Sequence, residues 1–308
     1  MARVVRFDRY GGVEVLHLVP AEVPVPGSQQ LLISVRAAGI NPFDTKVRTG
    51  LMEGRFPVDF PAPQGTDVAG VVEQVGPDVT DFKPGDEIVA STGRRGAQAD
   101  FALVPVKNAL PKPVNVSWEI AGALWVVATT GAAMVNSVKA GAGDTVLVSG
   151  ASGGVGVIAT QLARHRGATV IGVASESNHD WLRARGVIPI AYGDGLQERI
   201  ALALEQAGGG LDALLDIAGG GYVDLGVELG VDPARIDTIV DYEAAERLGA
   251  KAEGGAAAGA GEVAEVLGLI AAGELEVPIH RVFPLADVQA AYTELEQGHP
   301  RGKIVLMP

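Results

Sequence analysis

The sequence predicts an α/β protein in which a doubly wound parallel sheet follows a smaller, mostly β, barrel-like module. Three observations support this fold class. Short apolar runs separated by Gly and Pro fill about the first 117 residues. From about residue 118, β-branched runs alternate with helical patterns, which is typical of a parallel sheet covered by helices. A glycine cluster at residues 150–156 joins one such run to the helix that follows it.

The N-terminal module is expected to contain several short strands. They are predicted at residues 4–7, 31–36, 68–75 and 87–90. Prolines crowd the segments between these runs and mark turns. The pattern therefore indicates a compact β module.

The second part of the chain is expected to begin with a helix for which Ser117 is the N-cap. Strands are predicted at residues 145–149, 169–174, 188–192, 213–217 and 235–240, and helices from residues 155, 178 and 196. Residues 254–261, rich in Gly and Ala, form a link or a boundary loop. A helix at 262–271 follows. The tail, with elements at 277–282, 285–296 and 303–306, is expected to return to the first module.

Composition excludes several classes of function. The 308-residue chain has a net charge of −13, which argues against nucleic acid and anionic membranes as main partners. It contains no cysteine, so disulfides, thiolate catalysis and cysteine-bound zinc are excluded, and a cytoplasmic location is expected. The N-terminus lacks a signal-peptide pattern, and the longest apolar stretch, residues 121–135, is predicted to be a buried helix. The histidines show no metal-binding spacing; they are His17, His165, His179, His280 and His299.

The glycine cluster has the features of a phosphate-binding turn. It follows a predicted strand, opens a predicted helix and has the spacing Ala151-x-Gly153-x-x-Gly156, with alanine at the first glycine of the usual fingerprint. Glycine allows close approach of a ligand, and a helix N-terminus presents free N–H groups to a pyrophosphate. An ordinary glycine turn is the alternative. The candidate cofactor-binding residues are Ser152, Gly153, Gly154 and Val155.

The end of the second predicted strand favours NADP(H) over NAD(H). NAD-binding folds place a carboxylate there for the ribose 2′-OH, whereas this chain has Ala174 and Ser175. A missing carboxylate permits a 2′-phosphate. Glu176 is the objection, and we expect it to point to solvent. Asn178 and Tyr192 lie near in the predicted topology.

Segments spread over nearly the whole chain resemble one family. They are residues 37–44, 64–72, 82–89, 150–156, 214–220 and 301–306. In order and spacing they resemble the zinc-independent medium-chain dehydrogenases/reductases, in the quinone oxidoreductase (zeta-crystallin-like) branch. The resemblance implies a GroES-like catalytic domain at 1–117, a Rossmann NADP-binding domain at 118–256 and a C-terminal return to the catalytic domain at 257–308. It also implies an active cleft between the domains and a homodimer.

The resemblance also suggests the chemistry. Zinc-binding relatives carry Cys at the position of Asn41 and Gly-His-Glu where this chain has Gly65-Thr66-Asp67, so no metal is expected. What remains is hydride transfer from NADPH to a small-molecule quinone or α,β-unsaturated carbonyl (enone). An NADPH-binding regulatory or structural protein with little turnover is the alternative, and a zinc-free alcohol dehydrogenase is a third reading.

By the same resemblance, Asn41 and Thr130 are the catalytic candidates beside the nicotinamide. Further residues are implied to bind the cofactor: Ser175, Asn178, Tyr192, Gly219 and Lys303. Asn178 replaces a lysine that is common in relatives, which predicts a weaker grip on the 2′-phosphate.

Several polar residues have two interpretations. Asp44 and Asp67 are catalytic acids or, as we favour, supports for turns or domain contacts. Asp216 is expected to fix the sheet end. Arg94 and Arg95 either attract an acidic or quinoid substrate or form the solvated face of a loop, which is the commoner case.

Overall fold

A computed structural model describes residues 1–298 and 300–308, so His299 lies outside the described residues. The chain forms two compact units. The first contains Met1–Val126 and Pro278–Pro308, and the second contains Val127–Val277. The domain boundaries expected from the sequence lie after residues 117 and 256, and they stay a prediction about the functional domains.

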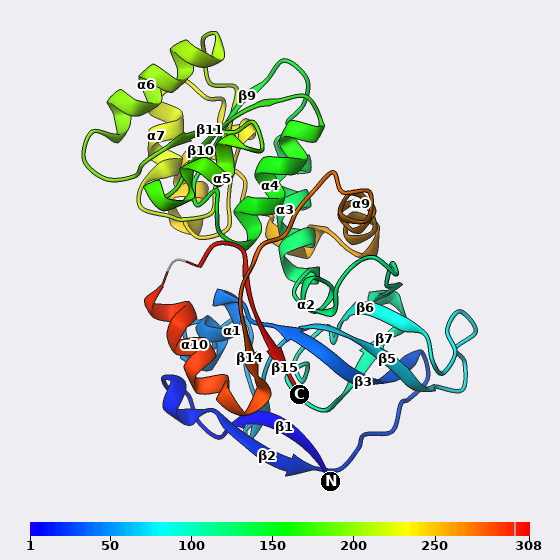
Figure 1. The fold of residues 1–308 in the computed structure, drawn as a ribbon. Helices are drawn as coiled ribbons and strands as arrows, with labels where there is room; N and C mark the ends of the chain where they lie inside the picture. The colour runs from blue at the N-terminus through cyan, green and yellow to red at the C-terminus, as the bar shows by residue number, and fades with distance from the viewer. Residues whose placement is uncertain (299) are drawn as a thin grey trace. The chain divides into compact units, whose positions relative to one another are not determined.

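The first unit is built mainly from strands (Figure 1). They are β1 (Ala2–Phe7), β2 (His17–Ala21), β3 (Gln30–Gly39), β4 (Ala62–Pro63), β5 (Asp67–Val75), β6 (Glu87–Ser91), β7 (Phe101–Pro105), β8 (Ala109–Pro111), β14 (Ile279–Pro284) and β15 (Lys303–Met307). One sheet has the order β2-β1-β4, and a seven-stranded sheet runs β14-β15-β3-β5-β6-β8, with β7 also paired to β3. The four predicted strands all lie within strands of this unit.

The core of the larger sheet follows from the alternation along β3. Leu31, Ile33 and Val35 are buried with Val68 and Val72 of the antiparallel neighbour β5. A side chain could not replace the hydrogen of Gly70, since an added Cβ would lie 2.2 Å from the Ser34 carbonyl oxygen. Close approach of the two backbones explains glycine at that position.

The C-terminal tail completes the first unit, as predicted. β15 pairs antiparallel with β3 at Gly39 and Ala38, and β14 lies parallel to β15. Figure 1 shows these two strands, in orange and red, beside the N-terminal blue strand β3. The helical elements of this unit are η1 (Val13–Val15), α1 (Pro42–Arg48), η2 (Val106–Asn108), α2 (Trp118–Gly122), η6 (Leu285–Asp287) and α10 (Val288–Gln297).

The second unit contains a parallel sheet of five strands. They are β9 (Thr145–Val148), β10 (Thr169–Val173), β11 (Ile188–Ile190), β12 (Ala213–Asp216) and β13 (Ile236–Thr238), in the order β11-β10-β9-β12-β13. Every neighbouring pair is parallel. The order reverses direction at β9, which confirms the doubly wound prediction and puts the switch point between β9 and β12.

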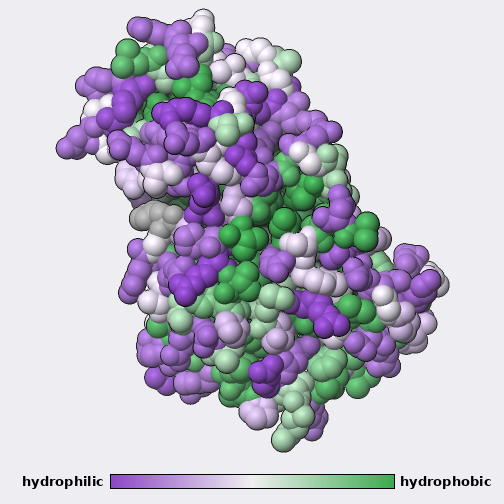
Figure 2. All heavy atoms as spheres, in the orientation of Figure 1, coloured by the Kyte–Doolittle hydropathy of each residue, from purple (hydrophilic) through white to green (hydrophobic). Residues whose placement is uncertain are grey.

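Helices cover both faces of this sheet. They are α3 (Trp125–Ser137), which begins in the first unit, α4 (Gly154–His165), η3 (Glu176–Asn178), α5 (His179–Arg183), α6 (Leu196–Ala207), α7 (Tyr222–Glu228), η4 (Pro233–Arg235), α8 (Tyr242–Leu248), η5 (Gly254–Ala257) and α9 (Ala260–Ala271). In Figure 1, α6 and α7 lie on one side of the sheet, and α3 and α4 lie on the other. Hydrophilic residues predominate over α5 and α6 on the face drawn in Figure 2.

Two local expectations were wrong. The apolar stretch 121–135 is not one helix, because α2 ends at Gly122 and α3 begins at Trp125. At this break the backbone passes close to β3, where a Cβ on Gly122 would lie 2.5 Å from the Ala37 carbonyl oxygen. The third strand of the parallel sheet ends at Ile190, so Tyr192 lies in the following loop rather than at the strand end. The N-cap role of Ser117 is confirmed, since its hydroxyl oxygen accepts a hydrogen bond from the Ile120 N–H.

Candidate functional site

The glycine turn lies at the switch point of the parallel sheet. The chain leaves β9, passes Gly150 in a left-handed conformation (φ +62°) and enters α4 with Gly153 as N-cap. Gly153 has no side chain to cap the helix, and the first turn of α4 carries no acidic residue. The first N–H groups of a helix have no partners within it, so this terminus can receive an anion.

The two main glycines of the turn differ in what surrounds them. A Cβ on Gly153 would meet only the Gly150 carbonyl oxygen, at an ordinary 3.5 Å, and its φ of −75° suits any residue. A Cβ on Gly156 would lie 2.1 Å from that same oxygen. Gly156 is therefore required by the turn itself, whereas the fold does not require glycine at Gly153. A cradle open at Gly153 fits a pyrophosphate, which needs close approach to bare backbone.

A buried polar network fixes the strand ends beside the turn. The Ser149 hydroxyl donates to Asp216 at 2.8 Å and accepts the N–H groups of Ile217 and Ala218. Asp216 also accepts the Thr238 hydroxyl at 2.8 Å and the Gly219 N–H at 2.9 Å. Asp216 thus organises the sheet end, as predicted, and it holds the loop that contains Gly219.

The residues expected near a 2′-phosphate follow adjacent strands. Ser175 follows β10, and the side-chain amide of Asn178, which is buried, donates to its hydroxyl at 2.9 Å. Tyr192 follows β11 and is 55% exposed. The Glu176 side chain is exposed to solvent.

Arg199 orders the loop that carries Tyr192. This role of Arg199 was not predicted from the sequence. Its guanidinium donates to four carbonyl oxygens, at 2.8–3.2 Å, those of Ala191, Tyr192, Gly193 and Asp194. A single planar fork of donors thereby fixes the whole loop and brings a positive charge to it. The sequence offered no signal for this role, because the contacts are to main-chain atoms.

Thr130 occupies a less open position than the resemblance implied. It lies in α3 and is buried, and a Cβ on Gly255 would approach its hydroxyl oxygen to 2.7 Å. The backbone of η5 therefore lies against this hydroxyl. The role of Thr130 beside a nicotinamide stays a prediction.

A second polar cluster is buried in the first unit. Asn41, which precedes α1, donates its side-chain amide to Asp67 at 3.0 Å, and its backbone N–H donates to Asp44 at 2.9 Å. The Lys303 ammonium donates to the Ile40 carbonyl at 2.9 Å and to the side-chain oxygen of Asn41. It lies 3.7 Å from Asp67, which also accepts the Val126 N–H. The amide of Asn41 is thus oriented at both ends.

Two of these residues were predicted site residues, and the others were not. Asn41 and Lys303 come together from opposite ends of the chain. Asp44 and Asp67, interpreted from the sequence as catalytic acids or, preferably, as supports, are the charged partners. Gln64 and Gln98 extend the cluster, since both donate to the hydroxyl of Tyr292, at 3.2 and 2.7 Å.

Burial sets the electrostatics of the cluster. Loss of water raises the pKa of Asp44 to about 7, and the negative charge of Asp67 adds to this, against the Asn41 N–H and Lys303. Burial also raises the pKa of Asp67, with Lys303 and hydrogen bonds opposing it, and lowers the pKa of Lys303 despite both carboxylates. The carboxyl of Asp44 is therefore able to hold a proton near neutral pH.

The stability of the first unit should fall as pH rises from about 4 to about 7. Unfolded Asp44 has a pKa of about 3.9, and in the folded chain its pKa is raised to about 7. The folded state thus binds more protons in this window, so the free energy of unfolding decreases with pH, by up to about 1.4 kcal/mol per unit. The loss is complete once the pH has risen through this folded pKa, about one unit above it. Urea denaturation of the wild type and Asp44→Asn from pH 4.5 to 8 measures it, and a pH-independent difference would contradict it.

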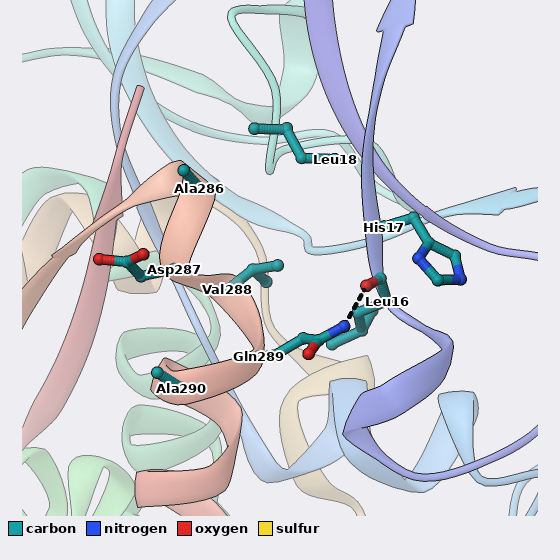
Figure 3. Close-up of a pocket in the computed structure, with 8 residues that line it drawn as sticks. All are labelled: Leu16, His17, Leu18, Ala286, Asp287, Val288, Gln289 and Ala290. Carbon is teal, nitrogen blue, oxygen red and sulfur yellow. Dashed lines mark hydrogen bonds between the residues drawn. The ribbon is translucent and has the colours of Figure 1, made fainter.

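The groove drawn in Figure 3 includes residues of neither the glycine turn nor the buried polar cluster around Asn41. It lies in the first unit between β2 and the start of α10, with a volume of about 510 Å³. It is lined by Leu16, His17, Leu18, Ala286, Asp287, Val288, Gln289 and Ala290. Its dashed hydrogen bond runs from Gln289 to the Leu16 carbonyl, 2.9 Å. None of the predicted site residues lines it.

Residues 1–298 and 300–308 show neither a metal cluster nor a membrane-spanning helix. Within that part of the chain, no group of three or more His, Cys, Asp or Glu side chains is placed to hold a metal ion. None of its helices combines the length and the apolar character needed to cross a membrane. Zinc independence stays a prediction.

Comparisons with known proteins agree with this geometry. The alcohol dehydrogenase GroES-like domain family matches residues 27–114, and the zinc-binding dehydrogenase family matches residues 189–306. The mouse quinone oxidoreductase is 41% identical over 176 residues, covering 56% of this chain and 53% of that protein. The chain is thus matched over only about half the length of this relative.

Solved structures match over the full chain. The quinone oxidoreductase of Coxiella burnetii superposes with a TM-score of 0.89 at 27% identity, covering 100% of this chain and 99% of that one. A mycobacterial protein solved in complex with NADPH gives a TM-score of 0.85 at 27% identity and covers both chains completely. The fold is therefore a GroES-like domain with a Rossmann-type parallel sheet, which confirms the predicted fold class.

Proposed function

Because this chain belongs to the medium-chain dehydrogenase/reductase superfamily, in its quinone oxidoreductase branch, we propose that it is a zinc-independent oxidoreductase that uses NADPH. Its acceptor is a quinone or an α,β-unsaturated carbonyl. The proposal includes a homodimer, as the family resemblance suggests, and a cytoplasmic location, as the lack of cysteine favours. Size-exclusion chromatography with light scattering tests the dimer.

The glycine turn is the observation that carries the proposal. Its open cradle at Gly153, at the N-terminus of α4 and at the switch point of the sheet, fits the pyrophosphate of a dinucleotide. The backbone of residues 152–155 would hold it. NADPH supplies hydride when bound, and the protein supplies position and electrostatics.

The remaining residues have proposed roles in binding and orientation. Ser175, Asn178 and Tyr192 would hold the 2′-phosphate, with Arg199 fixing the loop of Tyr192. Asn41 would orient the acceptor carbonyl, because Asp67 and Lys303 fix its amide and leave it a second N–H. Orientation of this kind can lower a barrier by several kcal/mol, up to about 7–11 kcal/mol when geometry is ideal.

A metal is not needed for this reaction. Where zinc-binding relatives are expected to have Cys and Gly-His-Glu, this chain has Asn41 and Gly65-Thr66-Asp67. The Asp67 carboxylate is already held by Asn41 and Lys303. We infer that Lys303 replaces a cation at this place with a protonated amine.

One assay series tests the function. NADPH oxidation is followed with 1,2- and 1,4-quinones, with enones and, in reverse, with simple alcohols and NADP⁺. We expect turnover with a quinone or an enone, and NADPH binding at least about tenfold tighter than NADH, which is about 1.4 kcal/mol. Tight NADPH binding without turnover of any acceptor would support a binding protein instead. Equal or tighter NADH binding would refute the cofactor assignment.

A further inference from the structure

The pair Arg94 and Arg95 is not used by the function proposed above. Arg94 is exposed and Arg95 is half-buried. Within the described residues no carboxylate lies within 4.0 Å of either guanidinium, although at least nine other arginines of the chain form such an ion pair. In a protein of net charge −13, two adjacent cations without a paired acid point to a missing anionic partner.

The arginines stand next to the buried cluster of Asn41. The three residues that follow Arg95 are hydrogen-bonded to the backbone of Gln64 and Gly65, through the N–H groups of residues 96, 97 and 98 at 3.1–3.2 Å. Gln64 in turn donates to the Asp44 carbonyl and to Tyr292. These backbone hydrogen bonds place the residues that follow the arginine pair beside residues 64 and 65, which precede Asp67.

The Arg95 side chain is held in a defined place. Its guanidinium donates to the carbonyl oxygens of Phe56 and Pro57, at 3.4 and 3.2 Å. Carbonyls are neutral, so these bonds fix the group without cancelling its charge. Burial lowers the pKa of Arg95, while the more distant Tyr10, Asp59 and Asp44 raise it and Arg94 lowers it. A solvated loop face would explain Arg94 alone, but not a half-buried Arg95 anchored by main-chain acceptors.

An apolar surface adjoins this charge. Phe56 is 38% exposed, and its ring contacts the ring of Phe43 edge-on, with centroids 5.1 Å apart. Phe43 lies in α1, two residues after Asn41 and next to Asp44. A substrate with a flat apolar part and an anionic group could therefore contact Phe56 with the first and Arg95 with the second, since the two residues are neighbours.

We propose that Arg94 and Arg95 form an anion subsite that selects acceptors carrying a carboxylate beside the reducible double bond. This inference rests on the proposed reductase function and narrows its substrate class to acidic enones or quinones. Arg95 is the positioning residue that binds the carboxylate, and Arg94 adds long-range attraction. The reaction itself is unchanged: hydride and a proton add across the double bond while NADPH becomes NADP⁺.

A matched pair of acceptors tests it. We compare kcat/KM for 4-oxopent-2-enoate and for its uncharged methyl ester, in the wild type and in Arg95→Gln, Arg95→Lys and Arg94→Gln. Arg95→Gln should lower kcat/KM for the acid about tenfold or more and change the ester less than about twofold. Arg95→Lys should retain part of the preference, and added salt should weaken it. Lys107→Gln, which removes an exposed cation of the same unit, is the control for net charge.

Each other result has a definite meaning. Equal losses on acid and ester, or a higher Kd for NADPH in Arg94→Gln, would overturn the subsite, because the arginines would then serve the loop or the cofactor. A wild type that reduces the ester but shows no advantage for the acid would also overturn it and leave the reductase function intact. A wild type that reduces neither, nor any simple quinone, would overturn the reductase function and this inference with it.

Discussion

Replacing Gly153 with valine should lower the affinity for NADPH at least about 100-fold, about 2.7 kcal/mol, while the second unit stays folded. The reason lies in the unequal surroundings of the turn glycines. A Cβ at Gly153 has room in the fold, and its backbone (φ −75°, ψ 175°) is extended and suits valine. The added side chain would occupy the space in front of the first N–H groups of α4, which the pyrophosphate needs. Calorimetric titration with NADPH and thermal unfolding measure the two effects.

Two other glycines of the same unit separate binding from folding. Gly156→Val should destabilise the unit itself, since its Cβ would lie 2.1 Å from the Gly150 carbonyl oxygen. Gly141→Val, where a Cβ would have only the Arg166 carbonyl oxygen at 3.9 Å, should leave both stability and affinity close to wild type. If Gly153→Val bound NADPH as tightly as Gly141→Val, the turn would not hold the phosphates.

The sequence predicted the second unit well because its signals are local. Four of the five strands contain β-branched residues, β12 being the exception, and the turn is marked by Gly150, whose left-handed conformation favours glycine. The lengths of the elements were predicted less well. The strand predicted to reach Tyr192 ends at Ile190. The break at Gly122 in the apolar stretch depends on Ala37 of β3, which lies about 85 residues earlier in the chain. Such boundaries are decided by tertiary contacts, and a short stretch of sequence carries no information about those contacts.

The polar cluster of the first unit could not be predicted in the same way. Asn41 and Asp44 lie three residues apart at the start of α1, but no spacing relates them to the members from the start of β5, the start of β15 and α10. Asp44 and Asp67 looked like turn residues, and Asp44 does pair with the Asn41 backbone at the start of α1. What the sequence lacked was their burial, which turns two ordinary carboxylates into a coupled system with Lys303.

This coupling gives Asn41 its fixed orientation. An isolated side-chain amide can rotate by half a turn at little cost, but here the ammonium of Lys303 faces its oxygen and the carboxylate of Asp67 faces its nitrogen. Only one orientation satisfies both neighbours. Burying the charges of Lys303 and Asp67 costs free energy, but these charges determine which end of the Asn41 amide presents an N–H donor.

Replacing Lys303 with methionine should lower the free energy of unfolding of the first unit by about 3–5 kcal/mol. Lys303 is 3% exposed and Asp67 is fully buried, so the variant leaves a carboxylate without its cation and an Asn41 oxygen without its donor. Methionine keeps the length of the apolar stem, which limits loss of packing. Urea denaturation at pH 8 should show the full effect. Near pH 5 the effect should be smaller, because Asp67, whose pKa is already raised, can then take up a proton.

The double variant Lys303→Met, Asp67→Asn isolates the cause of this loss. An amide at position 67 has one oxygen, which can still accept from the Asn41 amide or from the Val126 N–H, and it carries no charge. We therefore expect it to recover at least about half of the lost stability, and a coupling energy of at least about 1 kcal/mol between the two positions. If the double variant were as unstable as the sum of its single variants, the ammonium would stabilise the unit by packing alone. The fixed orientation proposed for Asn41 would then lack its electrostatic basis.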